Sequence, residues 1–355
     1  MMVFLMVVKS SRFDYLDILR MSAITFVVFI HSMDNMAGTH LFDERSGSFF
    51  MHGVLRSVGR IGVPLFFMMS GALLLSKPID FHSFFKKRMP RLIFSILLIA
   101  SLYELICVDL FDFLPHRHFL LGVLSGDSGY AYQLWFLYTT VGIYFAAPFV
   151  QKFLADSSDA LIVTYVLIST VLGFIPRTAL AFTHNHYIPA FMMEFFNPYI
   201  TYFILGYFLH NRVWIYPKNS LLISIMLAAI LIPGVMLQFL PLPGPGFIEK
   251  SDALLWHDKI FVLLSSVSYY LLIKKACQVR DVNPKVMKYV KYVSSSSFTI
   301  YLFHILVIYF YEYVGVDKMM GFVPSTMLLI VLCIVTCCVF NRILRRTPYA
   351  RKVFC

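Results

Sequence analysis

The chain has 355 residues, of which 59% are hydrophobic and only 14% charged, and its mean hydropathy is +0.76. A soluble domain carries charge on about a quarter of its residues, so this composition excludes an ordinary soluble protein. The net charge of +11 therefore bears on membrane topology and not on nucleic-acid binding. The six cysteines include no Cys-x-x-Cys pair, so a metal or thiol redox site is not expected.

Long, continuously apolar stretches predict an all-α polytopic bundle, because a β-barrel would show short alternating strands instead. Ten transmembrane helices are expected, at about 15–33, 58–75, 92–111, 132–153, 160–175, 197–210, 220–240, 255–273, 297–314 and 323–340. The loops between them reach only about twenty residues, too few to bury a core of their own. Residues 1–355 are therefore expected to form a single membrane domain with no fused soluble domain.

The distribution of Lys and Arg orients these spans. If the N-terminus is cytoplasmic, the segments on that side hold 21 of the 30 basic residues. This is the positive-inside pattern, and it predicts that both termini are cytoplasmic and that the number of spans is even.

The first span carries two ionisable residues in the apolar run Leu16–His31. Arg20 and His31 are eleven residues apart, so a helix places both on one stripe, about 16 Å apart along its axis. Ionisable residues inside a span mark a candidate functional site, although a snorkelling arginine and an interfacial histidine would also fit. Asp17 precedes the arginine, and Asp34 is a candidate orienting carboxylate for His31 if the helix continues that far.

A basic turn is expected at 76–91, with the sequence FFKKRMPR at Phe84–Arg91. On a helix, Arg88 and Arg91 would share one face at i and i+3, with Lys87 beside them. Two guanidinium groups there would form a fork for a phosphate or pyrophosphate. The ordinary positive charge of a cytoplasmic loop is the alternative explanation.

The second span begins RIGVPLFFMMSGALLL, with Arg60 at its outer end and Ser70 as a hydroxyl in mid-span. Pro64 is expected to break the backbone hydrogen bonds of this span, although a kinked packing helix would look the same.

Two further stretches carry residues of interest. Trp135 opens the fourth span at the outer face, where an aromatic belt also explains it. His304 lies inside the ninth span with Tyr301 one turn away, and a buried histidine needs a partner whether or not it is catalytic. The long connection at 176–196 holds His184, His186 and Glu194.

The order of these stretches resembles the acyltransferase 3 family of integral membrane acyltransferases, from about Leu16 to Leu306. The matching stretches are Asp17…Arg20-x10-His31, Val63–Gly71, Lys87-Arg88-x-x-Arg91, Leu134–Leu137 and, more weakly, Ser297…Tyr301-x-x-His304. The sequence QLWFLY at Gln133–Tyr138 also resembles the branch that holds the enterobacterial common antigen O-acetyltransferase.

The resemblance implies a multi-pass O-acetyltransferase of the bacterial plasma (inner) membrane. It would move an acetyl group from cytoplasmic acetyl-CoA to a hydroxyl of a cell-surface glycan or its lipid-linked precursor. Acetyl-CoA is then a donor substrate, and no tightly bound cofactor, metal or nucleic acid is expected. A transporter or flippase of a lipid-linked or small substrate is the alternative, since intramembrane Arg and His also fit that class.

The resemblance also assigns roles to residues. His31 is expected to be catalytic and Arg20 essential. The acyl-CoA-binding residues are expected to be Lys87, Arg88 and Arg91. Beyond what the resemblance implies, we expect supporting or acceptor-side roles for Asp17, Arg60, Ser70, Trp135 and His304.

Overall fold

The computed structural model describes residues 14–39, 47–111, 113–116, 118–182, 196–213, 216–239, 247–316 and 319–348. Within these ranges the chain is helical and contains no strand, which confirms the all-α fold class. His184, His186 and Glu194 lie outside the described residues.

Nine segments of the described chain are long and apolar enough to cross a membrane. The first four segments contain α1 (Asp14–Thr39); α2 (Gly47–Gly59) with α3 (Gly62–Leu74); α4 (Phe81–Phe111); and α5 (Phe119–Ser125) with the short helix η1 (Gly129–Leu134) and α6 (Trp135–Asp156). The fifth contains α7 (Asp159–Ser169) followed by η2 (Thr170–Phe174), α8 (Ile175–Ala179) and η3 (Leu180–Phe182). The last four contain one helix each, α10 (Asn219–Phe239), α12 (Ile260–Val279), α13 (Pro284–Tyr313) and α14 (Phe322–Leu344). The nine-residue α11 (Phe247–Leu255) precedes α12.

The 14-residue α9 (Pro198–Asn211) is shorter than these nine, at about 21 Å. It nevertheless runs beside α3 in the same direction. The ring of Tyr199 packs 5.2 Å from that of Phe67, and at the other end Asn211 Nδ2 donates to Ser76 Oγ at 2.9 Å. We infer that α9 is the tenth crossing, which agrees with the even number that the charge pattern requires.

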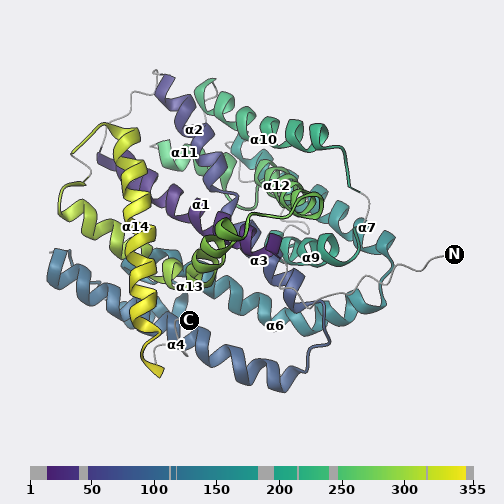
Figure 1. Ribbon diagram of the computed structural model, residues 1–355, viewed down its shortest axis with the longest axis horizontal. Coiled ribbons are helices and arrows are strands. Elements are labelled where there is room, and N and C mark those ends of the chain that lie inside the picture. Colours follow the sequence, from purple (N-terminus) through teal and green to yellow (C-terminus); the bar gives the residue numbers. More distant parts are fainter. Residues whose placement is uncertain are drawn as a thin grey trace.

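Helix α1 lies at the centre of the bundle, where α2, α3, α12, α13 and α14 pack around it (Figure 1). Its first half contributes Leu19 and Ala23 to a core shared with α3 and α9. Its second half contributes Ile24 and Val28 to a core shared with α4 and α13. Every group carried by α1 is therefore held in the interior by helices from distant parts of the chain.

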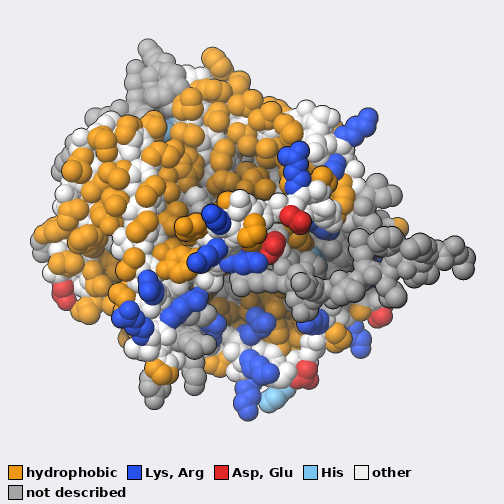
Figure 2. Space-filling model, in the orientation of Figure 1, with side chains coloured by type: hydrophobic (Ala, Val, Ile, Leu, Met, Phe, Trp, Pro, Cys, Tyr) orange, Lys and Arg blue, Asp and Glu red, His pale blue; other side chains and the backbone are white. Residues whose placement is uncertain are grey.

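One end of the bundle carries several Lys and Arg side chains, among them Lys86, Lys87, Arg88 and Arg91 at the start of α4. Ion pairs join Lys291 to Asp14 and Arg212 to Asp159 at the end where α1 begins, which we call the basic end. The opposite end, which carries His31, is called the His31 end. Large apolar side chains are exposed along α4, α10 and α14. Figure 2 shows hydrophobic side chains over much of one face, with Lys and Arg gathered in its middle and lower part.

The basic stretch at 84–91 is helical and not a turn, because α4 already begins at Phe81. Asp80 caps the helix by accepting a hydrogen bond of 2.9 Å from the backbone N–H of Ser83. The same hydrogen bond lowers the pKa of this exposed carboxyl. The side chain of Asn283 caps α13 in the same way. This helix starts at Pro284, whereas the sequence predicts that the span begins at residue 297.

The break in the second span lies at Arg60–Ile61, between α2 and α3, and not at Pro64. Pro64 falls in the first turn of α3. A backbone donor has no partner within the helix at that position, so proline is tolerated there.

Helices α3 and α9 cross in close contact at two glycines. A Cβ atom at Gly206 would collide with the carbonyl oxygen of Met68, and one at Gly71 with that of Phe203. Because the obstacles are backbone atoms, no side-chain adjustment can make room. Small residues at a helix crossing are the usual means of close approach in membrane proteins.

We expect Gly206→Ala to lower the thermal unfolding midpoint of the purified protein, with a cost of at least about 1–3 kcal/mol from overpacking. Gly142→Ala in α6 is the matched control, since nothing lies within 4 Å of the added Cβ there. Equal midpoints for the two variants would contradict the close crossing.

Candidate active site

Helix α1 carries both Arg20 and His31 without interruption, so the expected shared stripe is present. Both side chains are half-buried. They lie toward opposite ends of the bundle, and the remaining predicted residues divide between those two ends.

At the His31 end, two segments distant in the sequence, η1 and α13, meet at the imidazole of His31. The hydroxyl of Tyr132, from η1, lies 3.3 Å from His31 Nδ1. The ring of His304, from α13, lies 5.1 Å from the His31 ring between centroids. Tyr132 is 44% exposed whereas His304 is fully buried, so one side of His31 is open and the other is closed.

The backbone around Tyr132 is fixed by buried hydrogen bonds. Tyr301 Oη donates to the carbonyl oxygen of Gln133 at 2.7 Å, and Gln133 Nε2 donates to that of Leu302 at 3.3 Å. Tyr103, from α4, donates to the same Leu302 carbonyl at 2.8 Å. These contacts hold η1 against α13, and therefore Tyr132 against His31.

A cluster of four charged residues lies beside this group. Arg56, which is fully buried, pairs with Asp34 and places Nη2 2.7 Å from Asp252 Oδ1. Arg60 pairs with the same oxygen of Asp252. Buried guanidinium groups require such partners, because an unpaired charge in the interior is costly. Both arginines lie close enough to His31 to interact with it electrostatically.

This cluster changes the expectation for Asp34. Helix α1 does continue past it, as that hypothesis required. Its carboxylate nevertheless contacts Arg56 and not His31. Asp34 thus helps to fix α2 against α1 in place of orienting the histidine.

Aromatic side chains cover the charged cluster. Trp135, half-buried at the start of α6, packs 5.7 Å from Trp256 and 5.3 Å from His257 between ring centroids. Arg60 lies over the Trp256 ring at 4.7 Å. Burial and then the charge of Arg60 hold the pKa of His257 well below its usual range, so this residue stays neutral.

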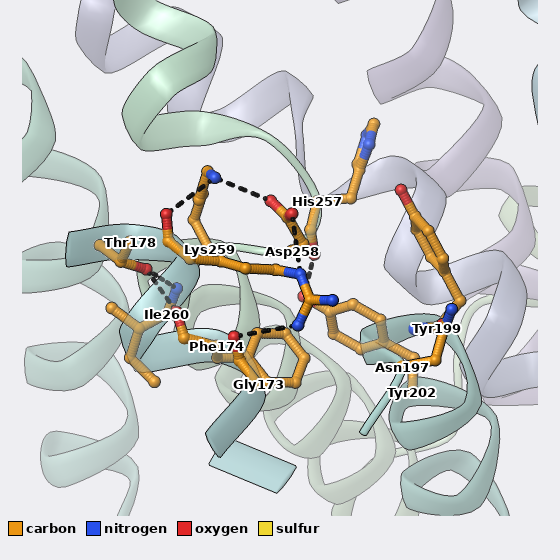
Figure 3. Close-up of polar contacts among 11 residues, drawn as sticks. Gly173, Phe174, Thr178, Asn197, Tyr199, Tyr202, His257, Asp258, Lys259 and Ile260 are labelled. Atoms are coloured by element: carbon orange, nitrogen blue, oxygen red, sulfur yellow. Dashed lines mark hydrogen bonds and ion pairs between the residues drawn. The ribbon is translucent and has the colours of Figure 1, made fainter. Parts of the chain in front are cut away.

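The turn that carries Trp256 and His257 is held from the side of α8 and α9 (Figure 3). Arg177 Nε lies 3.5 Å from Asp258 Oδ2, and Lys259 Nζ donates to the Arg177 carbonyl oxygen at 2.9 Å. Tyr202 donates to the carbonyl oxygen of His257, also at 2.9 Å. The aromatic cover therefore has a rigid support outside the cluster itself.

At the basic end, Asp17 is buried and accepts a hydrogen bond of 2.7 Å from Ser294 Oγ. Lys87 and Arg88 line an open pocket of about 250 Å³ between α3 and the start of α4. Arg88 lies over the ring of Tyr144 at 5.8 Å, and Arg91 over that of Phe298 at 5.0 Å. Arg88 also lies over the ring of Phe84 in α4 itself, at 5.2 Å, so the two guanidinium groups stack on different aromatic rings.

The predicted residues therefore form two groups and one separate position. His31, Arg60, Trp135 and His304 gather at the His31 end, and the basic end holds Asp17, Arg20, Lys87, Arg88 and Arg91. Ser70 lies in α3 beside the crossing with α9.

Three residues of this site, Tyr132, Arg56 and Asp252, were not predicted from the sequence. Tyr132 directly precedes the Gln133–Leu137 stretch. Among the described residues, no three or more His, Cys, Asp or Glu side chains gather as a metal site.

Comparison with known proteins gives one match. No curated protein and no solved structure matches the chain. The family model described as an acyltransferase domain (Acyl_transf_3) matches residues 13–342, nearly the whole chain. The matched region includes both ends of the candidate site. The protein therefore belongs to the acyltransferase 3 family, whose members are membrane acyltransferases.

Proposed function

We propose that the protein is a membrane-bound O-acetyltransferase of the bacterial plasma (inner) membrane. It moves an acetyl group from cytoplasmic acetyl-CoA to a hydroxyl of a cell-surface glycan or its lipid-linked precursor. One observation carries the proposal: an accessible imidazole and a basic pocket lie at opposite ends of one bundle. The likeness of Gln133–Tyr138 to the branch of the common antigen O-acetyltransferase favours a glycan acceptor.

The basic end supports a donor site. The positive-inside pattern turns it toward the cytoplasm, where acetyl-CoA is available. CoA carries phosphates, which guanidinium and ammonium groups bind through charge-assisted hydrogen bonds. Lys87 and Arg88 line the pocket there, and Arg91 lies one helical turn further along α4.

The His31 end supports the transfer chemistry. A neutral imidazole is the side chain best suited to take a proton from a hydroxyl near neutral pH. His31 is half-buried, and the exposed Tyr132 marks the open side from which an acceptor hydroxyl can approach. The Trp135–Trp256 surface beside it offers apolar faces for a sugar ring.

The two ends have to be connected, because the hydrocarbon core is about 30 Å thick. Arg20 lies on the same stripe as His31, about 16 Å nearer the cytoplasm. The pantetheine arm of the donor would run along this stripe from the basic pocket, with its thioester directed toward His31. Arg20 would then stabilise charge along the path of the donor.

Replacement of His31 tests the acceptor side. We expect His31→Ala to lower transfer by about 10²–10⁴-fold, since the proton acceptor is lost, while the protein still accumulates in the membrane. The measurement is mass spectrometry of surface glycan from a deletion strain that expresses the variant, scored by the acetyl increment. The exposed His118→Gln is the control, and wild-type acetylation by His31→Ala would remove His31 from the mechanism.

The donor site is tested by Arg88→Ala combined with Arg91→Ala. We expect the KM for acetyl-CoA to rise about 10–100-fold, because hydrogen bonds to a charged group contribute about 1.5–3 kcal/mol. The purified protein is assayed with labelled acetyl-CoA, and Lys152→Ala, an exposed cation near the basic end, is the matched control. An unchanged KM in the double variant would refute phosphate binding by these arginines.

The same assay separates an enzyme from a transporter. An acetyltransferase releases free CoA and places the label on the glycan. A transporter or flippase would leave the thioester intact.

A further inference from the structure

His304 has one nitrogen with partners and one without. Its Nδ1 lies 2.8 Å from the carbonyl oxygen of Tyr301 and 3.2 Å from that of Ile300, both in its own helix. A carbonyl oxygen can only accept, so Nδ1 carries the proton and donates it. The side chain is fully buried, and its Nε2 has no hydrogen-bond partner among the described residues.

This arrangement fixes the protonation of His304. A second proton on Nε2 would place a charged imidazolium in the apolar interior, which is costly without a counter-ion. His304 is therefore neutral, and Nε2 presents a lone pair. Because Nδ1 faces the backbone of α13, Nε2 lies on the opposite edge of the ring.

The ring packed against His304 from α1 is that of His31, at 5.1 Å between centroids. No hydrogen bond joins the two rings in this structure, but at this separation a change in ring orientation can bring one nitrogen of each to hydrogen-bonding distance, about 2.9 Å. Because two lone pairs repel, a nitrogen of His31 that approaches His304 Nε2 has to carry a proton. The Nδ1 of His31 is already directed at the Tyr132 hydroxyl, which leaves Nε2 as the nitrogen for His304.

We propose that His304 is the positioning residue of the transfer site, and that it sets the tautomer of His31 by accepting a hydrogen bond from His31 Nε2–H. The unprotonated Nδ1 of His31 is then the reacting nitrogen, on the open side beside Tyr132. The role is that of the orienting carboxylate in a serine hydrolase, filled here by a neutral acceptor that suits the apolar interior. This inference rests on the proposed function.

The transfer step balances with these residues alone. As the acceptor oxygen bonds to the acetyl carbon, its proton passes to His31 Nδ1. The C–S bond of the thioester breaks, and its electron pair stays on sulfur. The imidazolium, whose Nε2–H is held by His304, then gives the Nδ1 proton to the thiolate, and free CoA leaves. Both histidines end the cycle neutral.

Two near-isosteric variants of His304 separate this role from a structural one. His304→Asn keeps an amide nitrogen near the position of Nδ1, so it can still donate to the Tyr301 carbonyl, but it offers nothing at Nε2. His304→Gln reaches the position of Nε2 with an amide oxygen that can accept from His31. Purified full-length variants are assayed with acetyl-CoA and with surface glycan from the deletion strain as acceptor.

We expect His304→Asn to lower kcat at least about tenfold with KM for acetyl-CoA unchanged, since the loss of the bond to His31 does not touch the basic end. His304→Gln is expected to restore most of kcat. Rates are referred to folded protein, as judged from thermal unfolding midpoints, so a loss of stability does not imitate the effect.

Three results would overturn the inference. Wild-type kcat in both variants would show that His31 needs no acceptor from His304. An equal loss of kcat in both would show that an acceptor at the position of Nε2 is not what the reaction requires, and that His304 has only a structural role. If the wild-type protein releases no CoA in the presence of acceptor, the proposed function itself fails, and this inference fails with it.

Discussion

The structure depends on one constraint, which is that ionisable groups in an apolar bundle must find partners inside the protein. Helix α1, which lies at the centre of the bundle, carries several such groups, and each of them contacts a different part of the chain. Asp17 binds Ser294, Asp34 binds Arg56, and His31 packs against Tyr132 and His304. The polar contacts thus decide which helices surround α1, while the apolar cores hold them there.

The same constraint explains the form of the candidate active site. Arg56 and Arg60 are neutralised by Asp34 and Asp252, so the cluster beside His31 has no net charge. A neutral setting suits the proton transfer that we propose for His31. The rings of Trp135 and Trp256 shield these ion pairs in part from water. The contact between Arg177 and Asp258 holds the turn that carries Trp256 in place.

Much of this could be predicted from local sequence. The length of the apolar runs predicts the bundle, and the spacing of Arg20 and His31 places them on one stripe because helical geometry is regular. The starts of helices are harder to predict, because caps such as Asp80 and Asn283 lie among basic residues, which are typical of cytoplasmic loops.

The pairing of distant groups could not be predicted. Arg56 and Asp252 are 196 residues apart, and no local pattern in one sequence indicates that they meet. Nothing in the local sequence distinguishes Tyr132 from the other tyrosines of the chain, and only the three-dimensional arrangement places its hydroxyl beside His31. The sequence indicates His304 as a candidate because it is an ionisable residue in a span, but only the packing of α13 on α1 shows that its neighbour is His31.

The central claim is that the acetyl group enters at the basic end and leaves at the His31 end. A sided assay in proteoliposomes tests it most directly, with the orientation of the protein determined by protease access to the basic termini. Labelled acetyl-CoA is supplied on the side of the basic end and acceptor glycan only on the other side. We expect labelled glycan with the wild-type protein and none with His31→Ala. Transfer that requires donor and acceptor on the same side would contradict it.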